Sequence, residues 1–168
     1  MSNKLSDPAE LFMSLDDAVE WHNKLKKEGK KLVVTNGCFD IMHRGHAQYL
    51  HEARKLGDAM LVLINSDRSV SELKGPSRPV IAQENRAYML ASLQCVDAVV
   101  VFDGQQCTKE LAAIHPEVYV KGGDYTVETL NPDERAALQE GGAEFHFIPF
   151  IPGCSTTEVL AKINAENI

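Results

Sequence analysis

Residues 31–57 read KLVVTNGCFDIMHRGHAQYLHEARKLG, and this stretch decides the fold. Lys31 to Thr35 (KLVVT) is a short β-branched run of the kind that forms a strand buried on both faces. The segment from Gly45 to Lys55 has the pattern of a helix, and Gly57 is placed to end it. A buried strand, a loop that contains glycine and a helix therefore follow one another here.

The same order continues along the rest of the chain. We predict further strands at Ala59–Asn65, Ala98–Phe102, Val118–Lys121 and Glu144–Ile148, and further helices at Ala82–Gln94, Thr108–Ile114, Asp133–Glu140 and Thr156–Asn164. Regular alternation with short links predicts an α/β fold: a single Rossmann-like, doubly wound parallel sheet of five strands with helices on both faces. Ligands of such sheets bind beyond the carboxyl ends of the strands, where the strand order reverses. We therefore look for chemistry in the loops that follow strands.

A helix is also predicted before the first strand. Ser14 is a suitable N-cap with Asp17 three residues later, Gly29 is placed to end the helix, and one face carries Leu15, Val19, His22 and Leu25. Residues before Ser14 are expected to form a frayed arm. We therefore divide the chain into an N-terminal arm and helix, residues 1–30, and a domain at residues 31–168.

Size and composition are those of one soluble domain. The chain has 168 residues, of which 44% are hydrophobic and 24% charged. A domain of this length buries about 68–70% of its unfolded surface and needs no disulfide or metal for its stability. The sequence contains no CxxC pair and no apolar signal segment, and its four cysteines are Cys38, Cys95, Cys107 and Cys154. These features favour a reducing, cytoplasmic location.

The charge of the chain excludes some partners. A formal net charge of -7 disfavours nucleic acids and acidic membranes, and no apolar stretch is long enough to span a bilayer. A small anion needs only a local group of cations, which could be Lys74, Arg78, Arg86 and Lys121.

The loop after the first strand, Thr35 to His46, suits a phosphate group. Gly37 and Gly45 allow close approach of the backbone, and the start of the following helix offers N–H groups and partial positive charge. His43 and His46 are three residues apart and can donate from one face to a phosphoryl oxygen. Two alternatives stay open: the histidines are surface or capping residues, or they bind zinc together with Cys38.

The motifs, taken in order, resemble a known family. The run from Asn36 to His46, with its His-x-Gly-His tetrad, is similar to the signature of the cytidylyltransferase-like nucleotidyltransferases. Further motifs make the chain resemble the D-glycero-β-D-manno-heptose 1-phosphate adenylyltransferases over about residues 31–163, and these motifs are Leu73–Val80, Arg86, Val120–Tyr125 and Gly153–Thr157. The resemblance implies the nucleotidyltransferase type of α/β fold.

The resemblance also implies an activity and its residues. AMP would pass from ATP to the heptose 1-phosphate, giving ADP-heptose for lipopolysaccharide synthesis and pyrophosphate. His43, His46 and Lys74 would be catalytic, and Lys74, Arg78 and Arg86 would contact substrate phosphate. Arg86 could instead order the loop that carries Arg78, and each arginine could be a surface charge or salt-bridge partner. The nucleotide would lie against Asn36, Gly37, Cys38, Phe39, His43, Gly45, His46, Lys121, Gly123, Asp124, Cys154, Ser155, Thr156 and Thr157.

Several points accompany this assignment. Asp40 is expected to be structural, because an acid beside a triphosphate repels it. Mg²⁺ would be bound mainly by ATP phosphates, with no protein metal site. The Ser155–Glu158 segment has the form of a capping box at the last helix, and a turn would explain Gly122 and Gly123 as well as a ligand would. The resemblance implies a homodimer.

Two other functions stay open at this point. One is a cytidylyltransferase acting on glycerol phosphate or a related phosphate. The other is a nucleotide-binding sensor without catalysis, because a fold alone does not establish chemistry.

Overall fold

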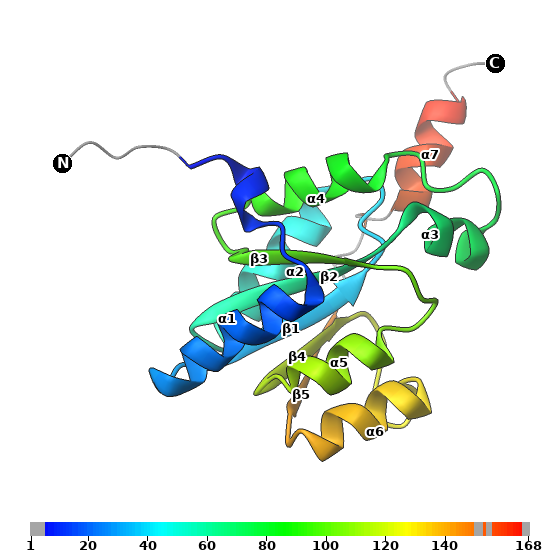
Figure 1. Ribbon diagram of the computed structural model, residues 1–168. Helices are drawn as coiled ribbons and strands as arrows, with labels where there is room; N and C mark the ends of the chain where they lie inside the picture. Colours follow the sequence, from blue (N-terminus) through cyan, green and yellow to red (C-terminus); the bar gives the residue numbers. More distant parts are fainter. Residues whose placement is uncertain (1–5, 150–152, 154–155, 166–168) are drawn as a thin grey trace.

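Five parallel strands form one sheet in a computed structural model that describes residues 6–149, 153 and 156–165 (Figure 1). The strand order is β3-β2-β1-β4-β5, with bounds β1 Leu32–Gly37, β2 Ala59–Asn65, β3 Ala98–Phe102, β4 Val118–Gly122 and β5 Glu144–Ile148. The helices are η1 Pro8–Leu11, α1 Leu15–Lys27, α2 Arg44–Arg54, α3 Asp67–Lys74, α4 Gln83–Ala91, α5 Thr108–Ile114, α6 Pro132–Glu140 and α7 Thr156–Ala165. The predicted doubly wound five-stranded α/β fold is confirmed.

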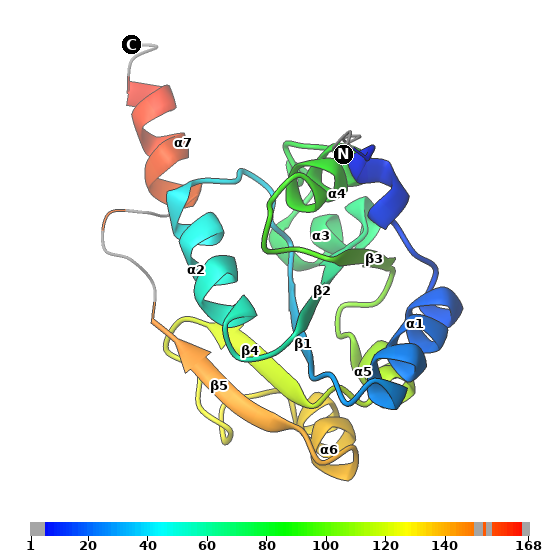
Figure 2. The same cartoon turned by 90° about the vertical axis from the view of Figure 1, so that its left-hand side faces the viewer.

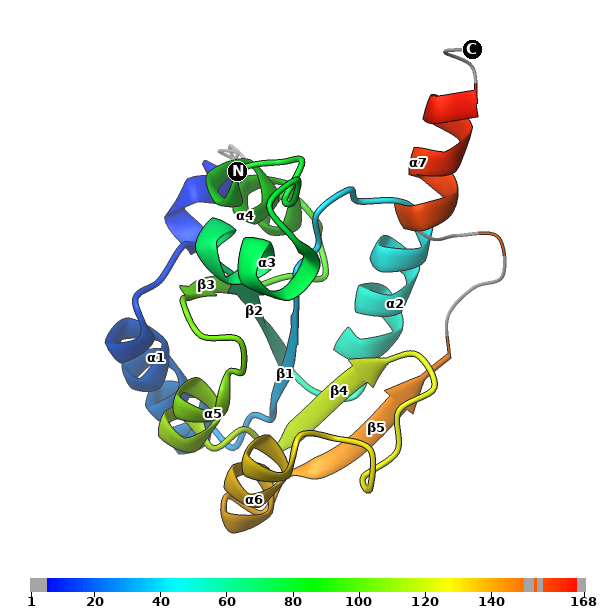
Figure 3. The same ribbon diagram turned by 90° about the vertical axis from the view of Figure 1, so that its right-hand side faces the viewer.

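Helices cover both faces of the sheet (Figures 2 and 3). One face packs on α1, α5 and α6, and the other packs on α2 and α4. Successive residues of β2 alternate between these two cores: Leu61 and Leu63 belong to the first, Met60 and Val62 to the second. Because both faces are buried, the central strands read as continuous apolar runs rather than alternating ones.

The strand order reverses between β1 and β4. After β3 the chain crosses to the far side of β1, where Val34 pairs with Tyr119 and Thr35 pairs with Val120. The carboxyl ends of β1 and β4 therefore lie side by side at the switch point, where the crossovers on the two faces leave room for a ligand.

Helix α3 was not predicted from the sequence. It begins after Ser66, whose hydroxyl accepts the Ser69 N–H at 3.1 Å, and it ends at Gly75, whose φ is +96°. The helix has only eight residues, and only Ser69 and Val70 are buried. So short a polar helix has almost no apolar periodicity, although its N-cap serine and terminal glycine were readable signals.

The expectation of a frayed arm is wrong for residues 8–13. Pro8–Leu11 forms a 3₁₀ turn, and the Met13 N–H donates to the Val99 carbonyl at 2.9 Å along the edge of β3. The helix that follows is as predicted: the Ser14 hydroxyl accepts the Asp17 N–H at 3.1 Å, and the helix buries one face on the sheet.

Helix α7 lies apart from the sheet, beyond the N-terminal end of α2 (Figures 1 and 2). The predicted capping box at its start rests on Ser155, which lies outside the described residues. Among the helices of the described part of the chain, none is both long and apolar enough to cross a membrane.

Candidate functional site

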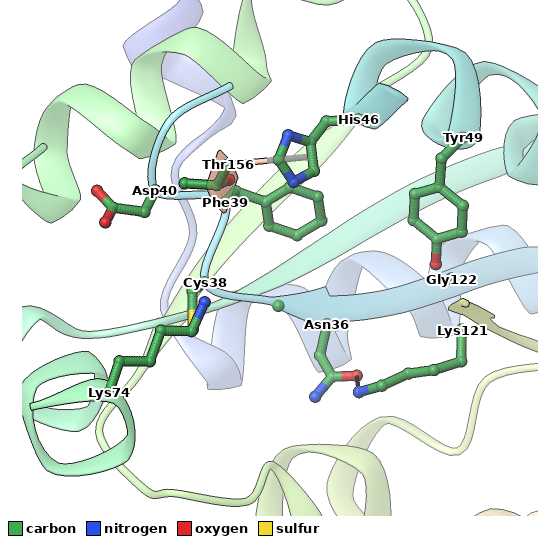
Figure 4. Close-up of a pocket in the computed structure, with 11 residues that line it drawn as sticks. Asn36, Cys38, Phe39, Asp40, His46, Tyr49, Lys74, Lys121, Gly122 and Thr156 are labelled. Atoms are coloured by element: carbon green, nitrogen blue, oxygen red, sulfur yellow. Dashed lines mark hydrogen bonds between the residues drawn. The ribbon is translucent and has the colours of Figure 1, made fainter. Parts of the chain in front are cut away.

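A cavity of about 150 Å³ lies at the carboxyl ends of β1 and β4 (Figure 4). Its walls come from the β1–α2 loop, the first turns of α2, the end of α3, the end of β4 and the first turn of α7. Residues that line it are Asn36, Gly37, Cys38, Phe39, Asp40, His46, Tyr49, Lys74, Lys121, Gly122 and Thr156. Eight residues proposed from the sequence therefore lie together: Asn36, Gly37, Cys38, Phe39, His46, Lys74, Lys121 and Thr156.

The two histidines cap the N-terminus of α2. The Gly45 N–H donates to His43 Nδ1 at 3.1 Å, and the His43 N–H donates to His46 Nδ1 at 3.4 Å. The rings stack with centroids 4.0 Å apart and an interplanar angle of 29°. Capping was one of the alternatives to a catalytic role, and both rings do cap the helix. His46 lines the cavity, whereas His43 stacks against His46 and is not among the lining residues.

These caps also determine where each ring carries its proton. A backbone N–H can only donate, so both Nδ1 atoms accept and both neutral rings carry hydrogen on Nε2. Burial, together with the nearby charges of His43 and Lys74, lowers the pKa of His46 to about 4. At neutral pH His46 is therefore an uncharged ring with an Nε2–H donor.

Phe39 gives the turn before α2 its shape. Its φ is +47°, a left-handed conformation that is rare for a bulky residue. The ring is buried, and its centroid lies 5.4 Å from that of His46. A Cβ on Gly37 would lie 3.0 Å from Cε2 of Phe39, so glycine at this position lets the ring fold back against the strand end.

Two lysines reach the cavity from different sides (Figure 4). Lys74 comes from the last turn of α3, and Lys121 from the end of β4. The Lys121 ammonium donates to Asn36 Oδ1 at 2.7 Å and lies 5.5 Å from the centre of the Tyr125 ring. Tyr119 donates its hydroxyl to the same Asn36 oxygen at 2.7 Å. Within the described residues neither lysine has a carboxylate partner, so both charges are available to an anion.

Asp40 is structural, as predicted. Its side chain is buried and accepts the N–H groups of Val80 and Ile81, each at 2.9 Å, and Arg78 Nε at 2.5 Å. Burial alone would raise the pKa of Asp40, but these hydrogen bonds and the Arg78 charge hold it below its usual value. Arg78 is thereby committed to Asp40, and it does not line the cavity.

Of the roles that the sequence allowed for Arg86, the structure agrees with the ordering of loops and not with a contact to substrate phosphate. Its side chain is 1% exposed, and the guanidinium donates to the carbonyl oxygens of Cys38, Asn65 and Ile81 and to the carboxylate of Asp67. With four acceptors already bound and no access to the cavity, Arg86 orders the surrounding loops.

Sequence reasoning missed Tyr49. It lies one turn after His46 on α2, and its hydroxyl bonds to Thr35 Oγ1 at 2.5 Å and to the Val120 carbonyl at 3.1 Å. These contacts join the helix to β1 and β4 at the wall of the cavity. The spacing of three residues from His46 was the available signal.

Gly45, Gly123, Asp124 and Thr157 were also predicted to bind the nucleotide, but they are not among the lining residues of the cavity. Gly45 lies in the first turn of α2; Gly123 is buried with φ +110°, and Asp124 and Thr157 are exposed. Cys154 and Ser155 lie outside the described residues. The zinc alternative finds no support in the described ranges, where no three His, Cys, Asp or Glu side chains form a metal-binding group.

The chain is similar to known proteins over most of its length. The chain is 48% identical over 139 residues to the bifunctional protein HldE of Methylococcus capsulatus, covering 83% of this chain and 29% of that protein. It is 43% identical over 160 residues to the HldE of Hahella chejuensis, covering 95% of this chain and 31% of that protein. The chain thus spans less than a third of the length of these relatives.

Solved structures share the fold. A lipopolysaccharide core biosynthesis protein from Thermoplasma volcanium superposes with a TM-score of 0.59 at 25% identity, covering 73% of this chain and 98% of that one. Pantoate-β-alanine ligase from Francisella tularensis gives a TM-score of 0.56 at 13% identity, covering 94% of this chain and 78% of that one, and this likeness concerns the fold alone. The model of the cytidylyltransferase-like family matches residues 34–162, and the chain belongs to that family.

Proposed function

We propose that this chain transfers AMP from ATP to D-glycero-β-D-manno-heptose 1-phosphate, giving ADP-heptose and pyrophosphate for lipopolysaccharide synthesis in the cytoplasm. Support comes from the cytidylyltransferase-like family, from the HldE relatives, and from the structural neighbour whose name refers to lipopolysaccharide core biosynthesis. The single observation that carries the proposal is the stacked pair of Nε2–H imidazoles at the N-terminus of α2, beside a cavity lined by Lys74 and Lys121.

The proposed reaction is an in-line displacement. A phosphate oxygen of the sugar 1-phosphate attacks the α-phosphorus of ATP, and the bond from that phosphorus to the pyrophosphate oxygen breaks. Negative charge grows on the oxygens around phosphorus, where the His43 and His46 Nε2–H groups and the start of α2 would donate. No protein nucleophile is needed, because positioning and charge stabilisation are sufficient for phosphoryl-type transfer.

The two lysines would serve the two sides of the displacement. Incoming and leaving oxygens lie on opposite sides of the phosphorus, and Lys74 and Lys121 enter the cavity from different sides (Figure 4). Lys74 and His46 line the same cavity, so Lys74 would bind the phosphate groups that His46 contacts. Lys121 would then bind a phosphate on the side of β4.

Mg²⁺ fits this site as a partner of the nucleotide. Among the described residues that line the cavity, Asp40 is the only carboxylate, and its oxygens already accept three donors. The protein would therefore contribute few ligands or none, and the ion would keep phosphate oxygens and water around it. When bound, it would offset the charge of the triphosphate.

A substrate panel tests the proposed function. Pyrophosphate release is measured with ATP and with CTP, each combined with heptose 1-phosphate and with glycerol phosphate. We expect turnover with ATP and heptose 1-phosphate. Release with CTP and glycerol phosphate would instead identify a cytidylyltransferase, and nucleotide binding without any turnover would identify a sensor.

Variants of His46 test the mechanism. A glutamine amide nitrogen can occupy the place of Nε2, whereas an asparagine amide reaches only the place of Nδ1. We expect His46→Ala and His46→Asn to lower kcat about 10²–10³-fold, as the loss of a preorganised donor does, and His46→Gln to retain more activity than either. Equal activity of all three variants and the wild type would refute the role of His46.

A further inference from the structure

Phe39 lies within a closed ring of contacts. Arg86 donates from Nη1 to the Cys38 carbonyl at 2.5 Å and from Nε to the Ile81 carbonyl at 2.9 Å. The Ile81 N–H in turn donates to the Asp40 carboxylate at 2.9 Å. Ile81 therefore bonds to Arg86 through its carbonyl and to Asp40 through its N–H. The ring is completed by the covalent backbone that runs from Cys38 through Phe39 to Asp40.

Arg86 also joins this ring to the helix that carries Lys74. Its Nη2 donates to the Asn65 carbonyl at the end of β2 and to the Asp67 carboxylate in the first turn of α3, both at 2.8 Å. One buried guanidinium therefore connects the β1–α2 turn, the β2–α3 junction and the loop before α4. The first two of these segments lead to His46 and Lys74 on different walls of the cavity.

The conformation of Phe39 explains why such a ring is needed. A left-handed bulky residue is strained, and it persists only where the surrounding structure holds it. Without the bond to the Cys38 carbonyl, the Cys38–Phe39 peptide can rotate and Phe39 can relax to negative φ. The Phe39 ring would then leave its place beside His46, and the turn that lines the cavity would change shape.

We propose that Arg86 is a positioning residue, which holds Phe39 in its left-handed conformation and thereby keeps His46 and the 36–40 turn shaped for the triphosphate. Arg86 touches no substrate. The inference rests on the proposed function for the measurement of turnover. Two other measurements, ATP affinity and the NMR shifts of His46, test it without assuming that reaction.

The test compares two substitutions with a matched control. Arg86→Met removes all four hydrogen bonds, and Arg86→Lys keeps the charge but not the planar fork that reaches four acceptors. Leu138→Ala opens a cavity in the core on the opposite face of the sheet and controls for lost stability. Each full-length protein is assayed for ATP affinity by calorimetry with Mg²⁺, for pyrophosphate release, and for its His46 ring-proton NMR shifts.

We expect Arg86→Met to weaken ATP binding and to lower kcat/KM by about 10²-fold, as a misplaced catalytic group does, while Leu138→Ala stays within about twofold of the wild type. The His46 resonances should move in Arg86→Met and not in Leu138→Ala, because the Phe39 ring current reaches His46. Arg86→Lys should lie between the wild type and Arg86→Met, and it carries the test if Arg86→Met does not fold.

Three results would overturn the proposal: equal ATP affinity in Arg86→Met and Leu138→Ala, unchanged His46 resonances in Arg86→Met, or an Arg86→Lys variant that matches the wild type. If the wild type binds ATP but turns over no sugar phosphate, the proposed function fails, while the affinities still decide the role of Arg86. If the wild type does not bind ATP, the resonances decide it alone.

Discussion

Both imidazoles at the start of α2 accept a backbone N–H at Nδ1, which places the hydrogen of each neutral ring on Nε2. Full protonation of either ring would require a hydrogen on the atom that accepts the backbone N–H, and would break the cap of α2. For His46 the buried position and the neighbouring charges act in the same direction. The contact that begins the helix at His46 therefore acts with burial to keep this donor uncharged and oriented.

A pH dependence follows for His46. Its pKa is about 4 in the folded protein, below the usual value near 6.5, so the ring stays neutral through the physiological range. Since kcat/KM reports the free enzyme, we expect no loss centred near pH 6.5 and a fall only as the pH approaches about 4. The profile of kcat/KM against pH, compared with that of His46→Gln, checks this. A wild-type transition near pH 6.5 that is absent from His46→Gln would contradict it.

At the scale of residues, the sequence predicted those that act locally. The His-x-Gly-His spacing places both rings on one helix turn, and local geometry is enough to bring them together. Arg86 could not be assigned in this way. Its four acceptors come from segments up to 48 positions away. The neighbouring sequence of an arginine does not show that its side chain is buried with hydrogen-bond partners from distant segments.

At the scale of elements, α3 depends on the glycine that ends it. Gly75 has φ +96° and ψ 166°, a region open almost only to glycine, and a Cβ there would meet no atom within 4 Å. Gly75→Ala should therefore cost about 1–3 kcal/mol through backbone strain alone. Because Lys74 is the preceding residue, we also expect a higher KM for ATP.

Gly29→Ala is the matched control for Gly75→Ala. Gly29 has φ +69° after α1, also without an atom within 4 Å of a Cβ, and it lies far from the cavity. Urea unfolding should record a loss of stability for both variants, and steady-state kinetics a change of KM for Gly75→Ala alone. An unchanged KM in Gly75→Ala would mean that the end of α3 does not position Lys74.

Elements with both faces buried were predictable, and elements placed by long-range contacts were not. Ala59–Asn65 has the bounds that the sequence predicted, because a central strand of a parallel sheet is apolar throughout. The edge strand Ala98–Phe102 also has its predicted bounds, and four of its five residues are buried. The edge contact of Met13 with Val99 depends on a partner 86 positions away, which no local pattern announces. The 3₁₀ turn itself is local, and its signal was the Asp7 N-cap followed by Pro8.

For the whole molecule, the division at residue 30 can be tested by truncation. Helix α1 buries Ala18 and Leu25 in one core, and His22 bonds to the Ile114 carbonyl and to Glu117, both at 2.9 Å. A protein of residues 31–168 would expose that core. We expect its Tm to fall by about 10 °C or more, whereas deletion of residues 1–13 should cost much less. A truncated protein that unfolds at the wild-type Tm would establish 31–168 as an independent domain.

The stability of the whole molecule should also fall in acid, in a way that Asp40 controls. Its pKa lies below 3.8 in the folded protein, so its ionised form contributes stability above the unfolded value, and this contribution is lost as the pH falls below about 3.8. Asp40→Asn leaves Arg78 without its carboxylate and weakens the bonds to Val80 and Ile81. At pH 7 we expect a loss of about 3 kcal/mol, the lower end of the cost of breaking a buried ion pair.

Asp103→Asn is the control for this acid effect, because Asp103 also pairs with an arginine, Arg68, but at the surface. Its pKa is lowered as well, chiefly by the hydrogen bond from Arg68, but solvent screens this pair. Removing the Asp103 charge should therefore change the free energy of unfolding far less than removing the Asp40 charge does.

Urea unfolding at pH 7 and at pH 3 measures both variants. The difference between Asp40→Asn and the wild type should shrink at pH 3, because below about 3.8 the carboxyl of the unfolded chain binds its proton while that of the folded protein resists it. A difference that is equally large at both pH values, or no greater than that of Asp103→Asn, would mean that the charge of Asp40 does not hold the 78–81 loop.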